Sequence, residues 1–131
     1  MYHGMLVRMK GKVLRAPAIY WRGAFGVCVV AVLVLSLMPP APHMPSTGWD
    51  KANHLLAFAV LAWLGCSAWP GRTVRVLCGL LAFGVLIEAL QSLTPYRVAE
   101  WSDLLADALG LALGWGAWAV SVAARRRVQP V

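Results

Sequence analysis

Four long apolar runs, separated by short polar or proline-rich stretches, dominate the pattern of the sequence. They extend over about residues 21–38, 52–69, 74–93 and 104–124. An α-helix rises about 1.5 Å per residue, so the shortest of these runs reaches about 27 Å as a helix. That length is close to the thickness of a membrane's hydrocarbon core, about 30 Å. The pattern therefore predicts four transmembrane helices.

The stretches between the runs fix how these helices connect. Four prolines follow the first run and prevent its helix from continuing. Pro70-Gly71 separates the second run from the third, and so short a turn allows only an antiparallel pair. We expect an all-α, polytopic membrane protein in which the four helices pack as two antiparallel hairpins. The expected organisation is a basic segment over residues 1–20, a membrane domain over 21–124 and a basic tail over 125–131.

The composition agrees with this class of protein. Of the 131 residues, 60% are hydrophobic and only 13% are charged, whereas soluble domains carry roughly a quarter charged residues. A basic start followed by one apolar run could also be a signal peptide. However, no good cleavage site follows Leu37 and three more runs come after it, so we interpret the first run as an uncleaved helix.

The net charge of +7 could suggest a nucleic-acid partner, but the basic residues lie at the ends of the apolar runs. Ten of the twelve fall on one side of the predicted membrane, and only Lys51 and Arg97 fall on the other. The positive-inside rule then places both termini in the cytoplasm, with the loops over residues 39–51 and 94–103 outside. We expect a multi-pass protein of the cell membrane with no nucleic-acid partner.

The three cysteines lie inside apolar runs without metal-binding or redox spacing, and we interpret them as small packing residues. They are Cys28, Cys66 and Cys78.

All five acidic residues fall toward the predicted outer end of the helices. Glu88 lies deepest, about 8 Å from the end of its run at 1.5 Å per residue. An acid within a membrane helix costs roughly 2.5–3.5 kcal/mol at mid-bilayer, so Glu88 must be neutral, paired or hydrated. Asp50 and His54 are four residues apart, as are Asp103 and Asp107, so each pair shares a helix face. We therefore expect a polar cluster that contains Asp50, Lys51, His54, Glu88, Gln91, Arg97, Asp103 and Asp107.

Each member of this cluster also has a simpler interpretation. Asp50 and Asp103 stand where helix N-caps are expected, and Lys51 and Arg97 could extend to the membrane interface. A lone histidine is more often a hydrogen-bonded packing residue than a base. For Glu88 the alternative is a structural hydrogen bond, to Gln91 or Arg97. Gly110 and Gly114 form a GxxxG pattern, which allows two helices to approach closely.

Three polar motifs of the chain resemble those of the VanZ-like family of membrane proteins. They are Asp50-Lys51-Ala52-Asn53-His54, then Gly84 with Glu88 and Gln91, then Arg97 with Asp103, Asp107 and Gly110. They are similar to the family's DKxxH, GxxxExxQ and RxxxxxDxxxNxxG elements, over about residues 39–118. One position differs, because Asp107 stands where the family usually has asparagine. The resemblance implies a multi-helix membrane domain and, for the family's namesake, lowered susceptibility to the glycopeptide teicoplanin, but no established reaction.

Two functions are compatible with these residues. The first is binding or remodelling of an envelope lipid, a lipid-linked cell-wall precursor or a lipoglycopeptide at an outward-facing polar pocket. The second is an enzyme, a hydrolase or transferase acting on such a lipid. Glu88 or His54 would then be the general base, and Arg97 or Lys51 would hold a phosphate.

The sequence offers such an enzyme no clear nucleophile, since Ser92 and Ser102 lie in no recognisable catalytic context. We assign no cofactor and no metal from the sequence, although His54 and the three acids Glu88, Asp103 and Asp107 could together hold a divalent ion. A transporter is a further possibility, but four helices are few for a substrate path without oligomerisation.

The predicted topology can be tested by labelling single cysteines in a cysteine-free background. We expect cysteines near Thr47 and Ala99 to react with a membrane-impermeant reagent from outside the cell, and one near Gln129 to be protected. The reverse pattern of accessibility would rule out cytoplasmic termini.

Overall fold

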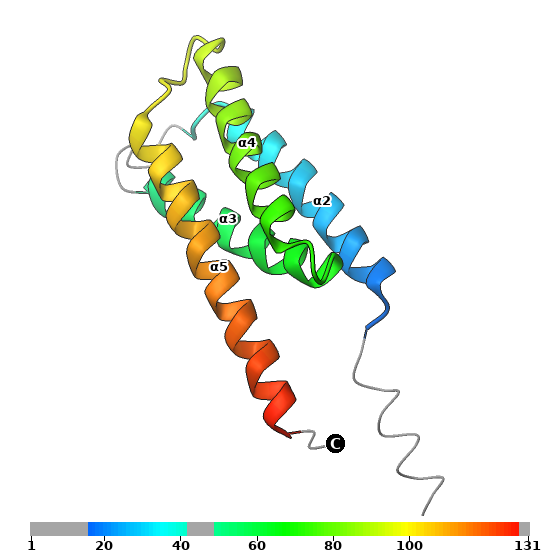
Figure 1. Ribbon diagram of the computed structural model, residues 1–131. Coiled ribbons are helices and arrows are strands. Elements are labelled where there is room, and N and C mark those ends of the chain that lie inside the picture. Colours follow the sequence, from blue (N-terminus) through cyan, green and yellow to red (C-terminus); the bar gives the residue numbers. More distant parts are fainter. Residues whose placement is uncertain (1–15, 42–48, 129–131) are drawn as a thin grey trace, which may run out of the picture.

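The computed structural model describes residues 16–41 and 49–128, and this part of the chain consists of helices joined by turns and loops (Figure 1). The helices are α2 (Ala18–Leu37), α3 (Trp49–Ala68), α4 (Thr73–Ser92) and α5 (Trp101–Val128). The all-α class and the number of long helices are confirmed. Most of the expected basic segment, and the last three residues of the expected tail, lie outside the described residues.

Helices α2, α3 and α5 begin three residues earlier than the apolar runs suggested. In α3 and α5 the additional turn contains polar residues, which is why the apolar pattern missed it. Asp50 and Asp103 lie inside the first turns of α3 and α5, so the interpretation of these acids as N-caps is wrong. Their charges still favour the helices, because the N-terminal end of a helix carries a partial positive charge. The last turn of α5 contains the arginine triplet 125–127, which has the corresponding favourable sign at a C-terminus.

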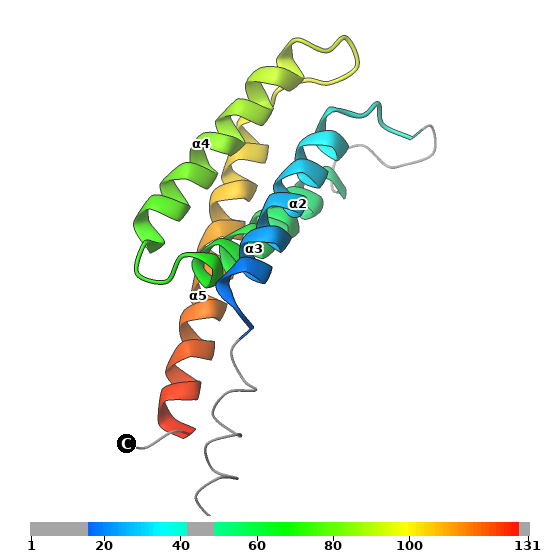
Figure 2. The same cartoon turned by 90° about the vertical axis from the view of Figure 1, so that its right-hand side faces the viewer.

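Helix α3 lies at the centre of the bundle. It contacts each of the other three helices, most extensively α5, and in both views it is inclined to them (Figures 1 and 2). Its side chains Phe58, Leu61, Ala62 and Cys66 are completely buried. The expected hairpins pair the first run with the second and the third run with the fourth. The largest contact between helices, that of α3 with α5, therefore joins one helix from each hairpin. The short α3–α4 turn is present, and Gly71 has a φ of 84° there, a conformation that favours glycine.

Two glycines of α5 allow this close contact. A Cβ atom on Gly110 would collide with the backbone carbonyl oxygen of Leu55, and one on Gly114 with that of Ala59. Leu55 and Ala59 are one turn apart on α3, as the glycines are on α5. The expected role of the GxxxG pattern is confirmed, since the two backbones meet where α5 has no side chain.

The outside of the bundle is apolar. Within the described chain, α2 has no buried residue, and its Val27 is 72% exposed. The cysteines differ as well, because Cys66 is buried but Cys78 is exposed, so Cys78 does not pack inside the chain. A soluble protein rarely exposes so continuous an apolar surface, whereas lipid chains cover it in a membrane.

By length and composition, α2, α4 and α5 are able to cross a membrane. Helix α3 is as long as α2 and α4, with 20 residues. However, its first turns contain Asp50, Lys51 and His54. It is not among the helices that are apolar enough by themselves. That α3 also crosses stays a prediction, and its central position explains why its side chains can be more polar.

The α3–α5 contact can be tested with the same substitution at two sites of α5. Gly114→Ala should lower the free energy of unfolding by about 1–3 kcal/mol, because the added methyl group has no room against the Ala59 carbonyl. Gly116→Ala should be neutral or stabilising by up to about 1 kcal/mol, because nothing lies within 4 Å of its Cβ position and alanine favours a helix. Unfolding in detergent micelles measures both. Equal effects at the two positions would contradict the close approach.

Candidate functional site

The polar residues gather at one end of the bundle, where α2 and α4 end and α3 and α5 begin; we call it the polar end. At its centre, the Nδ1 atom of His54 on α3 lies 2.8 Å from the Oδ1 atom of Asp107 on α5. His54 is 8% exposed and Asp107 is fully buried. A carboxylate hydrogen-bonded to one ring nitrogen fixes the orientation of the imidazole and leaves its other nitrogen available.

Glu88 and Asp103 complete this group. One ligating atom each of His54, Glu88 and Asp103 lie within 4.8 Å of one another. We call these three residues and Asp107 the polar core. Each of α3, α4 and α5 contributes at least one of its side chains, so it forms only when all three helices are packed together. The expected convergence of these four residues is observed.

Gly84 makes room for the polar core on α4. A Cβ atom there would lie 2.7 Å from Asp107 Oδ2 and 3.4 Å from the ring of Phe58. The carboxylate of Asp107 therefore packs directly against the backbone of α4, one helical turn before Glu88. Asp107 Oδ2 has no hydrogen-bond partner among the described residues.

Two ion pairs lie around the polar core, closer to the surface. Lys51 Nζ lies 3.3 Å from Glu100 Oε2, and Arg97 Nη1 lies 3.6 Å from Asp50 Oδ2. Each pair links the start of α3 to the segment between α4 and α5. We call these four residues the rim.

Glu100 connects the rim to the polar core. Its backbone N–H donates a hydrogen bond of 3.1 Å to Glu88 Oε2, and its side chain accepts one from the Ser102 hydroxyl. This hydroxyl and the neighbouring Lys51 ammonium hold the pKa of the Glu100 carboxyl below its usual value. The sequence suggested Gln91 or Arg97 as the hydrogen-bond partner of Glu88. That expectation is wrong, because the Glu88 carboxylate accepts its hydrogen bond from the backbone N–H of Glu100.

Gln91 does not join the polar core, although it is buried. Its side-chain nitrogen donates a 2.8 Å hydrogen bond to the carbonyl oxygen of Ser36. Tyr96 and Arg97 donate to the carbonyl oxygens of Leu37 and Met38. The last carbonyl groups of a helix have no partner within it, so these three side chains attach the end of α2 to the polar end.

The sequence missed two residues of the site. Glu100 was recognised as an outer acid but was not assigned to the cluster, and its backbone contact with Glu88 has no side-chain signal. Gly84 was part of a motif without a stated role. Its position one turn before Glu88 is the only signal that it lies beside the acids.

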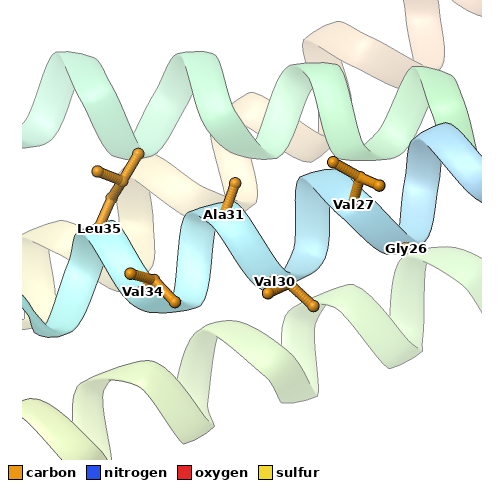
Figure 3. A pocket seen from close by; sticks show the side chains of 6 residues that line it. All are labelled: Gly26, Val27, Val30, Ala31, Val34 and Leu35. Carbon is orange, nitrogen blue, oxygen red and sulfur yellow. The ribbon is translucent and has the colours of Figure 1, made fainter.

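Two hollows of the surface lie away from the polar core. One, of about 630 Å³, runs along the exposed side of α2 and is lined by six residues of that helix between Gly26 and Leu35 (Figure 3). Val27, Ala31 and Leu35 point to one side of it, and Val30 and Val34 to the other. The second, of about 420 Å³, lies between α2 and α4 near Arg72 and Arg75. These arginines lie at the start of α4, at the end of the bundle opposite the polar end. Neither hollow is the outward-facing pocket expected from the sequence.

Fold and site together define a class, the α-helical membrane proteins that enclose a polar core among apolar helices. Comparison with known families gives a narrower result. The family model described as VanZ/LLP1 matches residues 30–122, which are 93 of the 131 residues and include every residue of the polar core and the rim. The chain belongs to the VanZ/LLP1 family. No curated protein and no solved structure matches it.

Residues of the three motifs contact one another in the folded chain. The Asp50–His54 segment supplies a partner to Arg97, to Glu100 and to Asp107. Asp107 accepts from His54 where the family usually has asparagine, and an asparagine carbonyl could accept the same hydrogen bond. The acid thus keeps the contact and adds a negative charge.

The His54–Asp107 pair can be tested by comparing two substitutions of Asp107. Asp107→Asn retains an oxygen that accepts from Nδ1, so we expect a loss in unfolding free energy of about 1 kcal/mol. Asp107→Leu leaves a buried imidazole without a partner and should cost about 1–3 kcal/mol. The double variant His54→Leu/Asp107→Leu should recover part of this loss, because both polar groups are then removed. Equal stability of Asp107→Asn and Asp107→Leu would show that the bond is unimportant.

Proposed function

We propose that the protein binds the anionic headgroup of an envelope amphiphile at its polar end, such as a lipid-linked cell-wall precursor or a lipoglycopeptide. The lipid chain of this ligand would lie against the apolar sides of the helices. The observation that carries the proposal is the enclosure of the polar core in an apolar bundle, beneath a rim that contains two basic side chains. Most basic residues of the sequence belong to the opposite end of the bundle, and this excess supports an outward-facing polar end.

The rim provides binding groups that a ligand can reach. Side chains of Lys51, Asp50 and Glu100 are about two-fifths to one-half exposed. The Lys51–Glu100 pair, exposed on both sides, contributes only about 0–1 kcal/mol, so a phosphate group can replace Glu100 at Lys51 at little cost. Arginine also offers two parallel donors to a phosphate.

Binding of a cell-wall precursor would connect the protein to glycopeptide susceptibility. A glycopeptide antibiotic acts on such precursors, so a protein that holds or redistributes them in the outer leaflet would alter how much antibiotic they bind. This consequence follows from the proposed ligand.

The His54–Asp107 pair supports a second candidate, a hydrolase. A buried imidazole held by a carboxylate is suited to accept a proton from a nucleophile. The nearby serines do not serve as that nucleophile in this geometry, because Ser92 donates to the Ala89 carbonyl at 2.6 Å and Ser102 to Glu100 at 3.0 Å. The nucleophile would be water, with His54 or Glu88 as its base.

Binding can be measured with purified protein in nanodiscs and a polyprenyl-diphosphate-linked sugar as the probe. We expect Lys51→Gln and Arg97→Gln to weaken binding about tenfold or more, as loss of a charged hydrogen bond implies. Arg127→Gln removes the same charge at the far end of α5 and is the matched control. If all three variants bind the probe as wild type does, the polar end is not the headgroup site.

The same incubation separates binding from catalysis. Release of the headgroup by wild type, and its loss in Glu88→Gln at equal abundance and helicity, would favour the hydrolase. An unchanged probe after binding would leave binding as the function. Glu88→Gln keeps the shape of the side chain and one acceptor but removes its charge, so any effect reports electrostatics or proton transfer.

A further inference from the structure

Three ligating atoms of the polar core lie close to the arrangement that a metal site requires. Two atoms bound at about 2.1 Å to one ion lie at most about 4.2 Å apart. The atoms of His54, Glu88 and Asp103 already lie within 4.8 Å of one another. Shifts of less than ~1 Å in the side chains would bring all three to a shared ion. One imidazole and two carboxylates form a mixed nitrogen and oxygen set, which suits zinc or manganese(II) better than the all-oxygen sets of calcium and magnesium.

The contact of His54 with Asp107 supports this arrangement. Metal-binding histidines almost always donate their second ring N–H to a carboxylate, a backbone carbonyl or a water. Here Nδ1 lies 2.8 Å from Asp107 Oδ1, so Nε2 is the nitrogen available to an ion. Asp107 is completely buried and would act as a positioning residue.

The charges give an independent reason. Asp103 is nine-tenths buried, and among the described residues its carboxylate has no hydrogen bond or ion pair, although it is aimed at His54 and Glu88. Glu88 Oε1 is also buried without a partner. The basic side chains at this end, Lys51 and Arg97, are engaged by the rim acids Glu100 and Asp50. The three carboxylates of the polar core therefore have one imidazole, that of His54, as the side chain among them that can carry a positive charge.

We propose that His54, Glu88 and Asp103 bind one zinc or manganese(II) ion, with Asp107 holding the imidazole. The three residues leave coordination positions open. The proposal rests on the proposed function in one respect: phosphate oxygens of the bound headgroup would take those open positions, beside Lys51 and Arg97. Binding of the ion itself does not require that function.

The test uses the full chain without a polyhistidine tag, stripped of metal with a chelator and titrated with Zn²⁺ or Mn²⁺ by calorimetry. We expect one ion per chain at the polar core. Glu88→Gln and Asp103→Asn, each nearly the same shape as the original, should weaken the affinity by more than about 100-fold, and Asp107→Asn by about tenfold, as positioning residues do. Glu100→Gln is the control, because it removes an acid at the same end that lies outside the ligand set.

A rise in the melting temperature of wild type with Zn²⁺ or Mn²⁺, absent in Asp103→Asn, would support the site without relying on affinity. Equal affinity in wild type, Glu88→Gln and Asp103→Asn, or no binding of either ion, would overturn it. Precursor binding, measured with both metal-free and metal-loaded protein, separates the two proposals. If the ion binds but the precursor does not, the metal site stands and the headgroup function fails; the opposite result leaves the function and removes the metal.

Discussion

His54 and Asp107 meet because α5 has no side chain where it crosses α3. Gly110 and Gly114 face the carbonyl oxygens of Leu55 and Ala59, and the approach of the two backbones brings the first turns of both helices together. The imidazole and the carboxylate then reach each other at 2.8 Å inside an apolar environment, where neither could remain without a partner. The steric condition and the polar one therefore select the same alignment of the two helices.

This alignment places the rest of the polar end. A shift of α5 along α3 by one residue would separate His54 from Asp107 and turn Asp103 away from Glu88. The other contacts follow from the ends of the helices: Gln91 and Tyr96 attach to the last carbonyls of α2, and Arg97 pairs with Asp50. The motifs that lie far apart in the sequence are thus partners of one another.

The sequence predicted the helices, and the eight residues of its expected cluster include the four of the polar core, because lipid tolerates few polar residues and their positions along each run define a depth. It could not predict which helix is central. All four runs are long and largely apolar, and the large α3–α5 contact depends on two glycines whose partners are backbone atoms. Nor could it separate Gln91 from Glu88, since residues three apart share a helix face. The structure distinguishes them by their partners, an α2 carbonyl for one and the polar core for the other.

The central position of α3 has a consequence for the biogenesis of the protein. A ribosome completes α3 before α5, so the helix that is not apolar enough to cross a membrane by itself must reach the membrane while its main partner is not yet synthesised. During that interval Asp50, Lys51 and His54 have none of the contacts that Arg97, Glu100 and Asp107 later provide. We therefore expect α3 to insert stably only once the fourth helix is present, and a chain truncated before Trp101 to leave α3 without its partners.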